Sequence, residues 1–145
     1  MLNMPQRPDG QLDEECLFIL KRLEAWFAVH GQAIYGTRPW KVAGEGPTQG
    51  EAGAFKENAM PWTAQDFRFT TDKDAVYAFQ MKQPHDGLAV IHSLGILDAG
   101  NVRGVSLLGS TTPVEFTQFH KALTIKTGTV QVPGPVLCYR IEVDP

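Results

Sequence analysis

Cysteine and serine are scarce in this chain: two of its 145 residues are cysteines and three are serines. Cys16 lies in a helical pattern and Cys138 in a strand pattern, with no C-x-x-C pair, so we predict two free thiols. The four histidines are scattered, without a pair at helical or strand spacing, and a zinc site is not expected. No G-x-S-x-G, Walker or G-x-G-x-x-G motif occurs. The sequence therefore predicts no metal and no cofactor.

The chain also lacks a basic excess and a long hydrophobic run. Its 13 Lys+Arg against 16 Asp+Glu give a net charge of −3, which argues against nucleic acid as a partner. No apolar run approaches the ~20 residues of a membrane span, and the first ten residues lack the apolar segment of a signal peptide. The length suffices for one ordinary domain but not for a (β/α)₈ barrel, which needs roughly 200–250 residues.

One amphipathic helix is strongly marked between residues 12 and 30. Asp13, Glu14 and Glu15 lie in its first turn, where negative charge interacts favourably with the positive end of the helix dipole. Gly31 is typical of the position just past the end of a helix. Apolar residues recur in steps of three and four: Leu12, Cys16, Ile19, Leu20, Leu23, Trp26 and Phe27. This stripe is wide, and no second strong helix is present to cover it.

Beyond the helix the pattern changes twice. From residue 35 to about 61 the chain is rich in glycine and proline, which predicts an irregular connection between domains. From Ala64 onward the sequence pattern repeats every two residues, as expected for β-strands. The expected strands are 67–71, 74–81, 88–94, 103–108, 114–119, 122–127 and 137–143. In the last of them, Leu137 and Tyr139 share one face, while Cys138 and Arg140 lie on the polar one. These observations predict a mainly β fold, an antiparallel β-sandwich preceded by one long helix.

No set of side chains assembles into a catalytic centre. His92 precedes Ser93, but neighbours on a strand point to opposite faces, so His92 is badly placed as a base for that serine. Trp40 and Trp62 flank the Gly/Pro-rich stretch and are candidates for stacking on a sugar. The competing interpretation is that both indoles fill the junction between the helix and the sandwich.

Several segments resemble bacterial alpha-L-fucosidases of glycoside hydrolase family 29. The most specific is AIYGTRPW, from Ala33 to Trp40. Further matching segments follow in the family's order and cover nearly the whole chain: RPDG at 7–10, GEGPT at 44–48, TAQDFRFTT at 63–71, VYA at 76–78, VSLLGS at 105–110 and LTI at 123–125. The chain departs from the family at His30, where the family usually has Asn, and this change is harmless at a helix C-terminus.

The resemblance implies an architecture. In that family a catalytic (β/α)₈-like barrel is followed by a C-terminal β-sandwich. Residues 1–40 would then be the last strand, loop and helix of a truncated barrel, 41–62 the Gly/Pro-rich connection, and 63–145 the sandwich. The helix is left over from the barrel, and its wide apolar stripe is explained because the barrel that would cover it is missing from this chain.

The resemblance also implies a function. The family performs retaining hydrolysis of terminal alpha-L-fucosyl linkages, a reaction that uses two carboxylates. By family likeness the Asp nucleophile and the Glu acid/base precede Leu2, so this chain holds no catalytic residue and is expected to be inactive alone. Asn3 and Gln6 would lie in a loop next to the substrate. The implied partners are a fucosylated glycan, bound by the full-length enzyme, and the missing barrel, which the sandwich would buttress.

Two other classes of function stay open. A free-standing carbohydrate-binding module would use Trp40 or Trp62 as a stacking platform, with exposed, coplanar rings on a flat or concave sheet. A protein-interaction domain would instead bury the apolar stripe of the helix on a partner chain.

Overall fold

The computed structural model describes residues 5–48, 61–128, 132 and 134–144. The first helix is long, α1 (Glu14–His30), and the 3₁₀ turn η1 (Gly31–Ala33) follows it. The strands are β1 (Arg38–Glu45), β2 (Phe67–Thr71), β3 (Val76–Gln80), β4 (Leu88–Ile91), β5 (Val102–Leu107), β6 (Glu115–Phe119), β7 (Ala122–Lys126) and β8 (Leu137–Val143). The turn η2 (His92–Leu94) and the short helix α2 (Ile96–Ala99) lie between β4 and β5.

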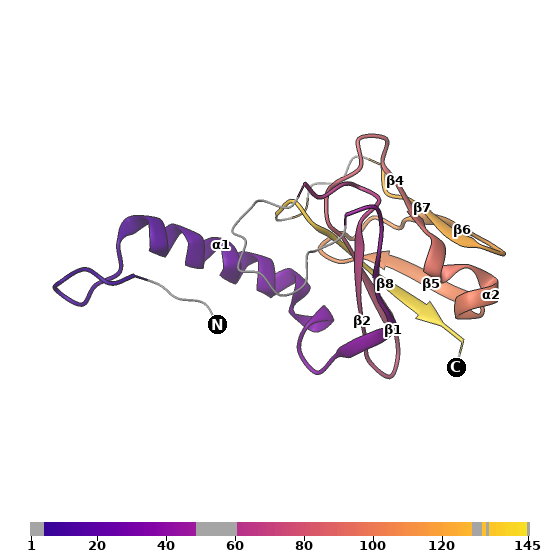
Figure 1. The fold of residues 1–145 in the computed structure, drawn as a ribbon, viewed down its shortest axis with the longest axis horizontal. Helices are drawn as coiled ribbons and strands as arrows, with labels where there is room; N and C mark the ends of the chain where they lie inside the picture. The colour runs from indigo at the N-terminus through magenta and orange to yellow at the C-terminus, as the bar shows by residue number, and fades with distance from the viewer. Residues whose placement is uncertain (1–4, 49–60, 129–131, 133, 145) are drawn as a thin grey trace.

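The described strands form two antiparallel sheets. A five-stranded sheet has the order β1-β2-β3-β8-β5, and a three-stranded sheet has the order β4-β7-β6. Helix α1 extends from the sheets as an arm, so that its C-terminal end is next to them and its N-terminal end projects away (Figure 1). A mainly β fold of antiparallel sheets preceded by one long helix is therefore confirmed.

Helix α1 begins and ends with the residues that its sequence predicts. Asp13 is the N-cap, and its Oδ1 accepts a hydrogen bond from the Cys16 backbone N–H at 2.7 Å, with two glutamates in the first turn. At the other end, the Gly31 N–H donates to the Phe27 carbonyl. Seventeen residues thus form one continuous helix.

The main core lies between the two sheets. Alternate residues of the strands point inward because successive side chains on a strand face opposite ways. The buried set includes Phe67, Phe69, Ile91, Leu123, Ile125, Tyr139 and Ile141, which come from both sheets. The Tyr139 Oη donates to the Gln80 Oε1 at 2.7 Å, and the Gln80 Nε2 donates to the Ala64 carbonyl at 2.8 Å. These bonds satisfy polar groups that burial would otherwise penalise.

A second cluster lies on the other face of the five-stranded sheet, under the C-terminal half of α1. Trp26 and Val29 of the helix pack on buried residues of η1, β3 and β8 and their neighbours, namely Ala33, Ala75, Tyr77, Phe79, Leu108 and Cys138. Cys138 is fully buried there, so the prediction that it faces a polar surface is wrong. The alternation along β8 is as expected, but the helix covers this end of the face. Both Cys16 and Cys138 are free, as predicted.

The prediction of irregular chain from residue 35 is wrong for β1. This strand lies at the edge of the five-stranded sheet, with Arg38 opposite Thr71, Gly44 opposite Arg68 and an irregular register between them. Proline and glycine are depleted in strands, so Pro39 and Gly44 obscured the signal; an edge strand tolerates proline because one side needs no donor. β1 crosses the boundary predicted at residues 40 and 41.

Gly95 lies against the turn between β6 and β7. A Cβ atom added there would lie 2.6 Å from both the His120 carbonyl oxygen and the Lys121 Cα. Because these are backbone atoms, Gly95→Ala should lower the free energy of unfolding by about 1–3 kcal/mol. Gly104→Ala is the matched control, since its Cβ would lie 3.4 Å from the flexible Glu142 Oε2. Urea unfolding of both variants measures the difference; equal midpoints would contradict the tight packing of Gly95.

Candidate functional site

The two residues predicted to lie near a substrate precede α1. Asn3 lies outside the described residues. Gln6 is exposed and forms an isolated antiparallel bridge with Leu12. This folded-back segment brings the Pro5 carbonyl to 3.9 Å from the Cys16 Sγ, at the end of α1 that projects from the sheets (Figure 1). A role for Asn3 or Gln6 next to a substrate stays a prediction.

The two candidate stacking residues are both half-buried. Trp40 meets the edge of Phe69 at a centroid distance of 5.3 Å, and the Arg68 guanidinium carbon lies 4.9 Å from the Trp62 ring centroid. Arg68 and Phe69 are consecutive on β2 and point to opposite faces. Trp40 and Trp62 thus contact opposite faces of the five-stranded sheet and do not form one joint platform. Stacking of either ring on a sugar stays a prediction.

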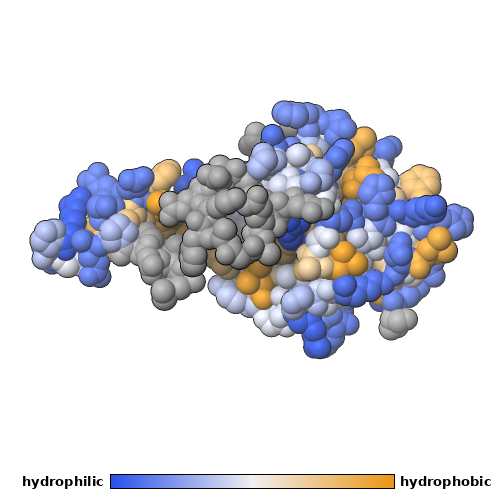
Figure 2. Space-filling model, in the orientation of Figure 1, coloured by the Kyte–Doolittle hydropathy of each residue, from blue (hydrophilic) through white to orange (hydrophobic). Residues whose placement is uncertain are grey.

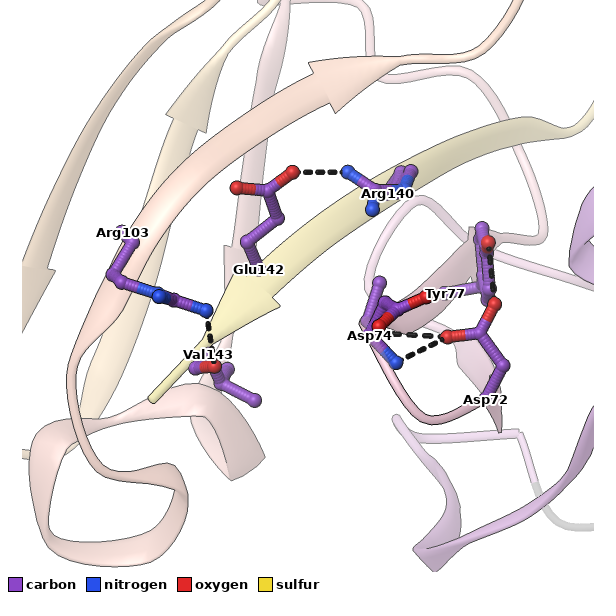
Figure 3. Close-up of polar contacts among 8 residues, drawn as sticks. Asp72, Asp74, Tyr77, Arg103, Arg140, Glu142 and Val143 are labelled. Atoms are coloured by element: carbon purple, nitrogen blue, oxygen red, sulfur yellow. Dashed lines mark hydrogen bonds and ion pairs between the residues drawn. The ribbon is translucent and has the colours of Figure 1, made fainter. Parts of the chain in front are cut away.

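Charged side chains gather on β8, on the start of β5 and in the turn between β2 and β3 (Figure 3). Arg140 and Glu142, both on β8, form an ion pair. Arg103 on β5 pairs with Asp144 at 3.2 Å and donates to the Val143 carbonyl at 3.4 Å.

Asp72 lies beside this group in the turn between β2 and β3. Its Oδ1 accepts hydrogen bonds from the Asp74 and Ala75 N–H groups at 2.8 Å each, and its Oδ2 accepts one from the Tyr77 Oη at 3.0 Å. Burial raises the pKa of Asp72, but these bonds outweigh it and hold the pKa below its usual value. Burial and the Asp72 carboxylate raise the pKa of Tyr77.

This charged group does not have the electrostatics of an acid/base pair. A general acid of glycoside hydrolysis needs a carboxyl group with a raised pKa. Here the pKa values of Asp72 and Glu142 are both lowered, the latter by the hydrogen bond from Arg140. Both carboxylates are occupied by partners in the chain, which fits a structural role for the group.

Neither a metal centre nor a membrane helix is present in the described part of the chain. Across residues 5–48 and 61–144, apart from the gaps given above, no group of three or more His, Cys, Asp or Glu side chains could hold a metal ion. Over the same residues, no helix has both the length and the apolar character needed to cross a membrane.

Sequence reasoning missed Asp66, which is fully buried. Its Oδ1 accepts from the Thr48 N–H at 2.8 Å; its Oδ2 accepts from the Thr48 Oγ1 at 2.7 Å and from the Thr63 N–H and Oγ1 at 2.7 and 2.8 Å. Burial raises the pKa of Asp66, but these hydrogen bonds lower it to about 2. We refer to Thr48, Thr63 and Asp66 as the Asp66 clamp. The T-x-x-D spacing of Thr63 and Asp66 resembles a capping pattern and was the available signal.

Glu45 was also missed. Its carboxylate accepts hydrogen bonds from the His92 and Ser93 N–H groups, at 2.7 Å each, and from the Ser93 Oγ. Glu45 thereby joins β1 of one sheet to η2, which follows β4 of the other. The prediction that the strand continues to residue 94 is wrong, because the chain turns after Ile91 and directs these N–H groups to Glu45.

Comparison with known proteins gives matches over nearly the whole chain. No family model matches it. In sequence it is 25% identical to tissue alpha-L-fucosidase of Rattus norvegicus over 118 residues. These aligned residues make up 81% of this chain and 21% of that protein. It is also 25% identical over 133 residues to an alpha-L-fucosidase of Branchiostoma floridae, 92% of this chain and 24% of that protein.

Solved structures show the same fold. The Thermotoga maritima alpha-fucosidase in complex with a mechanism-based inhibitor matches with a TM-score of 0.70 and 20% identity, covering 98% of this chain and 30% of that one. A further alpha-L-fucosidase matches with a TM-score of 0.70 and 22% identity, covering 98% and 28%. This chain spans about a fifth to a quarter of the length of its curated relatives. In sequence and in fold it thus resembles one part of alpha-L-fucosidases, consistent with their C-terminal portion.

Proposed function

We propose that this chain is the C-terminal portion of a retaining alpha-L-fucosidase, and that the complete enzyme hydrolyses terminal alpha-L-fucosyl linkages of glycans. In this proposal the two sheets and α1 buttress a catalytic barrel formed by the remainder of the enzyme. The observation that carries it is the match of 81% and 92% of this chain to only 21% and 24% of two alpha-L-fucosidases.

Helix α1 supports the proposed contact with a barrel. Its C-terminal half packs on the sheet through Trp26 and Val29. Further toward its N-terminus, Leu17, Phe18 and Ile19 are 44%, 59% and 41% exposed, and Figure 2 shows hydrophobic surface on this arm beside hydrophilic side chains. Burial of apolar surface is favourable by about 25 cal/mol per Å², so docking of this arm on a further domain would stabilise the assembly.

The chemistry of the described carboxylates supports an inactive portion. Retaining hydrolysis needs two carboxyl groups about 5–5.5 Å apart, one of them able to donate a proton near neutral pH. The four described carboxyl groups whose pKa departs from its usual value all have it lowered: Asp13, Asp66, Asp72 and Glu142. Each is held by hydrogen bonds within the chain. The lowered pKa values of these described carboxyl groups support our proposal that both catalytic carboxylates belong to the remainder of the enzyme.

The 145-residue chain should release no 4-nitrophenol from 4-nitrophenyl alpha-L-fucoside above a blank without protein. The same chain joined to the portion encoded upstream in the same reading frame should hydrolyse this substrate. Turnover by the 145 residues alone, or the absence of any upstream portion, would contradict the proposal. Binding of free fucose by the 145-residue chain would instead favour a carbohydrate-binding module.

The proposed role of α1 has its own test in the joined enzyme. Phe18→Glu places a charge on the exposed arm and should lower the melting temperature of the enzyme, because the docked surface would then bury a carboxylate. Leu97→Glu is the matched control, since Leu97 is exposed on α2, at the opposite end of the molecule from the arm (Figure 1). Equal effects of the two substitutions would argue against docking through α1.

A further inference from the structure

His30, the last residue of α1, is fully buried. Its Nδ1 lies 3.0 Å from the Trp26 carbonyl oxygen, which assigns the proton to Nδ1 as the donor. Its Nε2 is buried and has no hydrogen-bond partner among the residues that the structure describes. In the neutral ring, Nε2 is therefore a buried acceptor without a partner among the described residues.

His30 is part of a stack of rings that attaches α1 to the sheet. The His30 and Trp26 rings are stacked at a centroid distance of 4.7 Å with an interplanar angle of 20°. Trp26 in turn stacks on Phe79 of β3 at 6.3 Å and 27°. We refer to His30, Trp26 and Phe79 as the His30 stack. It joins the C-terminal end of α1 to the outer face of the five-stranded sheet.

Protonation of His30 would place a charge in this stack. The imidazolium would carry a new Nε2–H donor without an acceptor among the described residues, and burying an unpaired charge is costly. Burial lowers the pKa of His30 and outweighs the hydrogen bond to the Trp26 carbonyl. The face of the Trp26 ring would attract the imidazolium, but it does not pair the Nε2–H or replace the lost hydration. A positive charge on His30 therefore disfavours the stacked arrangement.

The neighbouring titratable groups do not compensate this charge. The packed elements contribute Tyr77 from β3 and Cys138 from β8, and burial raises the pKa of both, so they remain neutral in acid. On the helix itself, Arg22 and Glu24 are exposed to solvent. The turn η1 consists of Gly31, Gln32 and Ala33, none of which titrates.

We propose that the contact between helix α1 and the five-stranded sheet is a proton-sensitive attachment: uptake of one proton by His30 releases the C-terminal half of α1 while the two sheets stay packed. The sheets stay packed because the core between them consists of buried apolar side chains such as Phe67, Ile91 and Ile125, which do not titrate. Directly before β2 of the five-stranded sheet, Asp66 has a pKa of about 2 and keeps its charge and its four hydrogen bonds far below the pH at which a histidine titrates. The other histidines, His85, His92 and His120, are exposed.

The sign of the pH dependence follows from the neutral stacked form. In the released helix His30 has an ordinary pKa of about 6.5. Attachment is therefore complete above this pH and weakens as the pH falls, until the pKa of the stacked form is reached. Within that window the ratio of attached to released helix falls by up to about tenfold per pH unit, because one proton is taken up.

Nuclear magnetic resonance of the 145-residue chain tests this attachment. The Trp26 indole N–H signal should change with a midpoint below pH 6.5, while the Trp40 indole, packed on the main core, should stay unchanged down to pH 4. His30→Asn should abolish the change at Trp26, because the amide does not titrate. His92→Asn, at an exposed histidine, is the matched control and should leave it intact.

Three results would overturn the proposal. They are a His30→Asn variant that keeps the transition, a Trp40 signal that moves together with Trp26, and a Trp26 signal that does not respond between pH 7 and 4. If His30→Asn fails to fold, the ring-carbon signal of His30 in the unmodified chain replaces it and must titrate together with Trp26. The test uses this chain alone, so its outcome is independent of the proposed fucosidase function.

Discussion

Replacing Asp66 with asparagine should lower the free energy of unfolding by about 2–4 kcal/mol, since each hydrogen bond to a charged group contributes about 1.5–3 kcal/mol. The Asp66 Oδ2 alone accepts three hydrogen bonds, from the Thr48 Oγ1 and from the N–H and Oγ1 of Thr63. Asparagine keeps one acceptor oxygen and turns an NH₂ group toward donors. At 145 residues, each 1 kcal/mol corresponds to about 2–4 °C in melting temperature.

Acid should remove the difference in the free energy of unfolding between the Asp66→Asn variant and the unsubstituted chain. The folded pKa of Asp66 is about 2, below its usual value of 3.8. Its contribution to stability is therefore complete above pH 3.8 and is lost as the pH falls toward 2. Asp86→Asn is the matched control, because the Asp86 Oδ1 caps an exposed turn by accepting from the Leu88 N–H at 3.1 Å. If this control and Asp66→Asn shift the unfolding midpoint equally at pH 7, the clamp does not stabilise the fold.

Phe67→Ala should cost about 3–5 kcal/mol, the range for removing a large aromatic side chain from a packed core. Phe67 is fully buried between the sheets and its ring lies parallel to Phe69 at a centroid distance of 6.3 Å. The truncation removes this contact and leaves a cavity that two paired sheets cannot close. Guanidinium unfolding followed by circular dichroism measures the loss.

Phe119→Ala provides the comparison for that loss. Phe119 ends β6 and is 55% exposed, so its truncation should change the free energy of unfolding by less than about 1 kcal/mol. A Phe67→Ala variant as stable as Phe119→Ala would mean that the core between the sheets is not packed as described.

The local patterns of the sequence predicted the elements well. The three-and-four spacing in α1, with Asp13 before it and Gly31 after it, marks both ends of the helix. Strands with clear alternation, such as β8, were found because one face is buried in the main core. Strand β1 was not found, since Pro39 and Gly44 interrupt its pattern and it is stabilised by pairing with β2.

The polar contacts could not be predicted in the same way, because they join residues far apart in sequence. The Asp66 clamp reaches back 18 residues to Thr48, and Glu45 reaches forward 48 residues to Ser93. The local sequence points only to Thr63 as a partner of Asp66, and it indicates neither Thr48 for Asp66 nor Ser93 for Glu45. His30 fits the end of a helix by its local sequence, and its burial follows only from the packing of α1 on the sheet. Asn3, Gln6, Trp40 and Trp62 remain predictions as site residues.

The position of β1 determines how a mechanical load would pass through the molecule. The chain runs from α1 through η1 into β1, and the Thr70 Oγ1 of β2 donates to the Ala33 carbonyl of η1 at 2.6 Å. β1 is paired to β2 in one sheet and tied by Glu45 to η2 beside the other. A force that pulls on α1 therefore reaches β1 first, and passes from β1 to both sheets through its pairing with β2 and through the hydrogen bonds of Glu45.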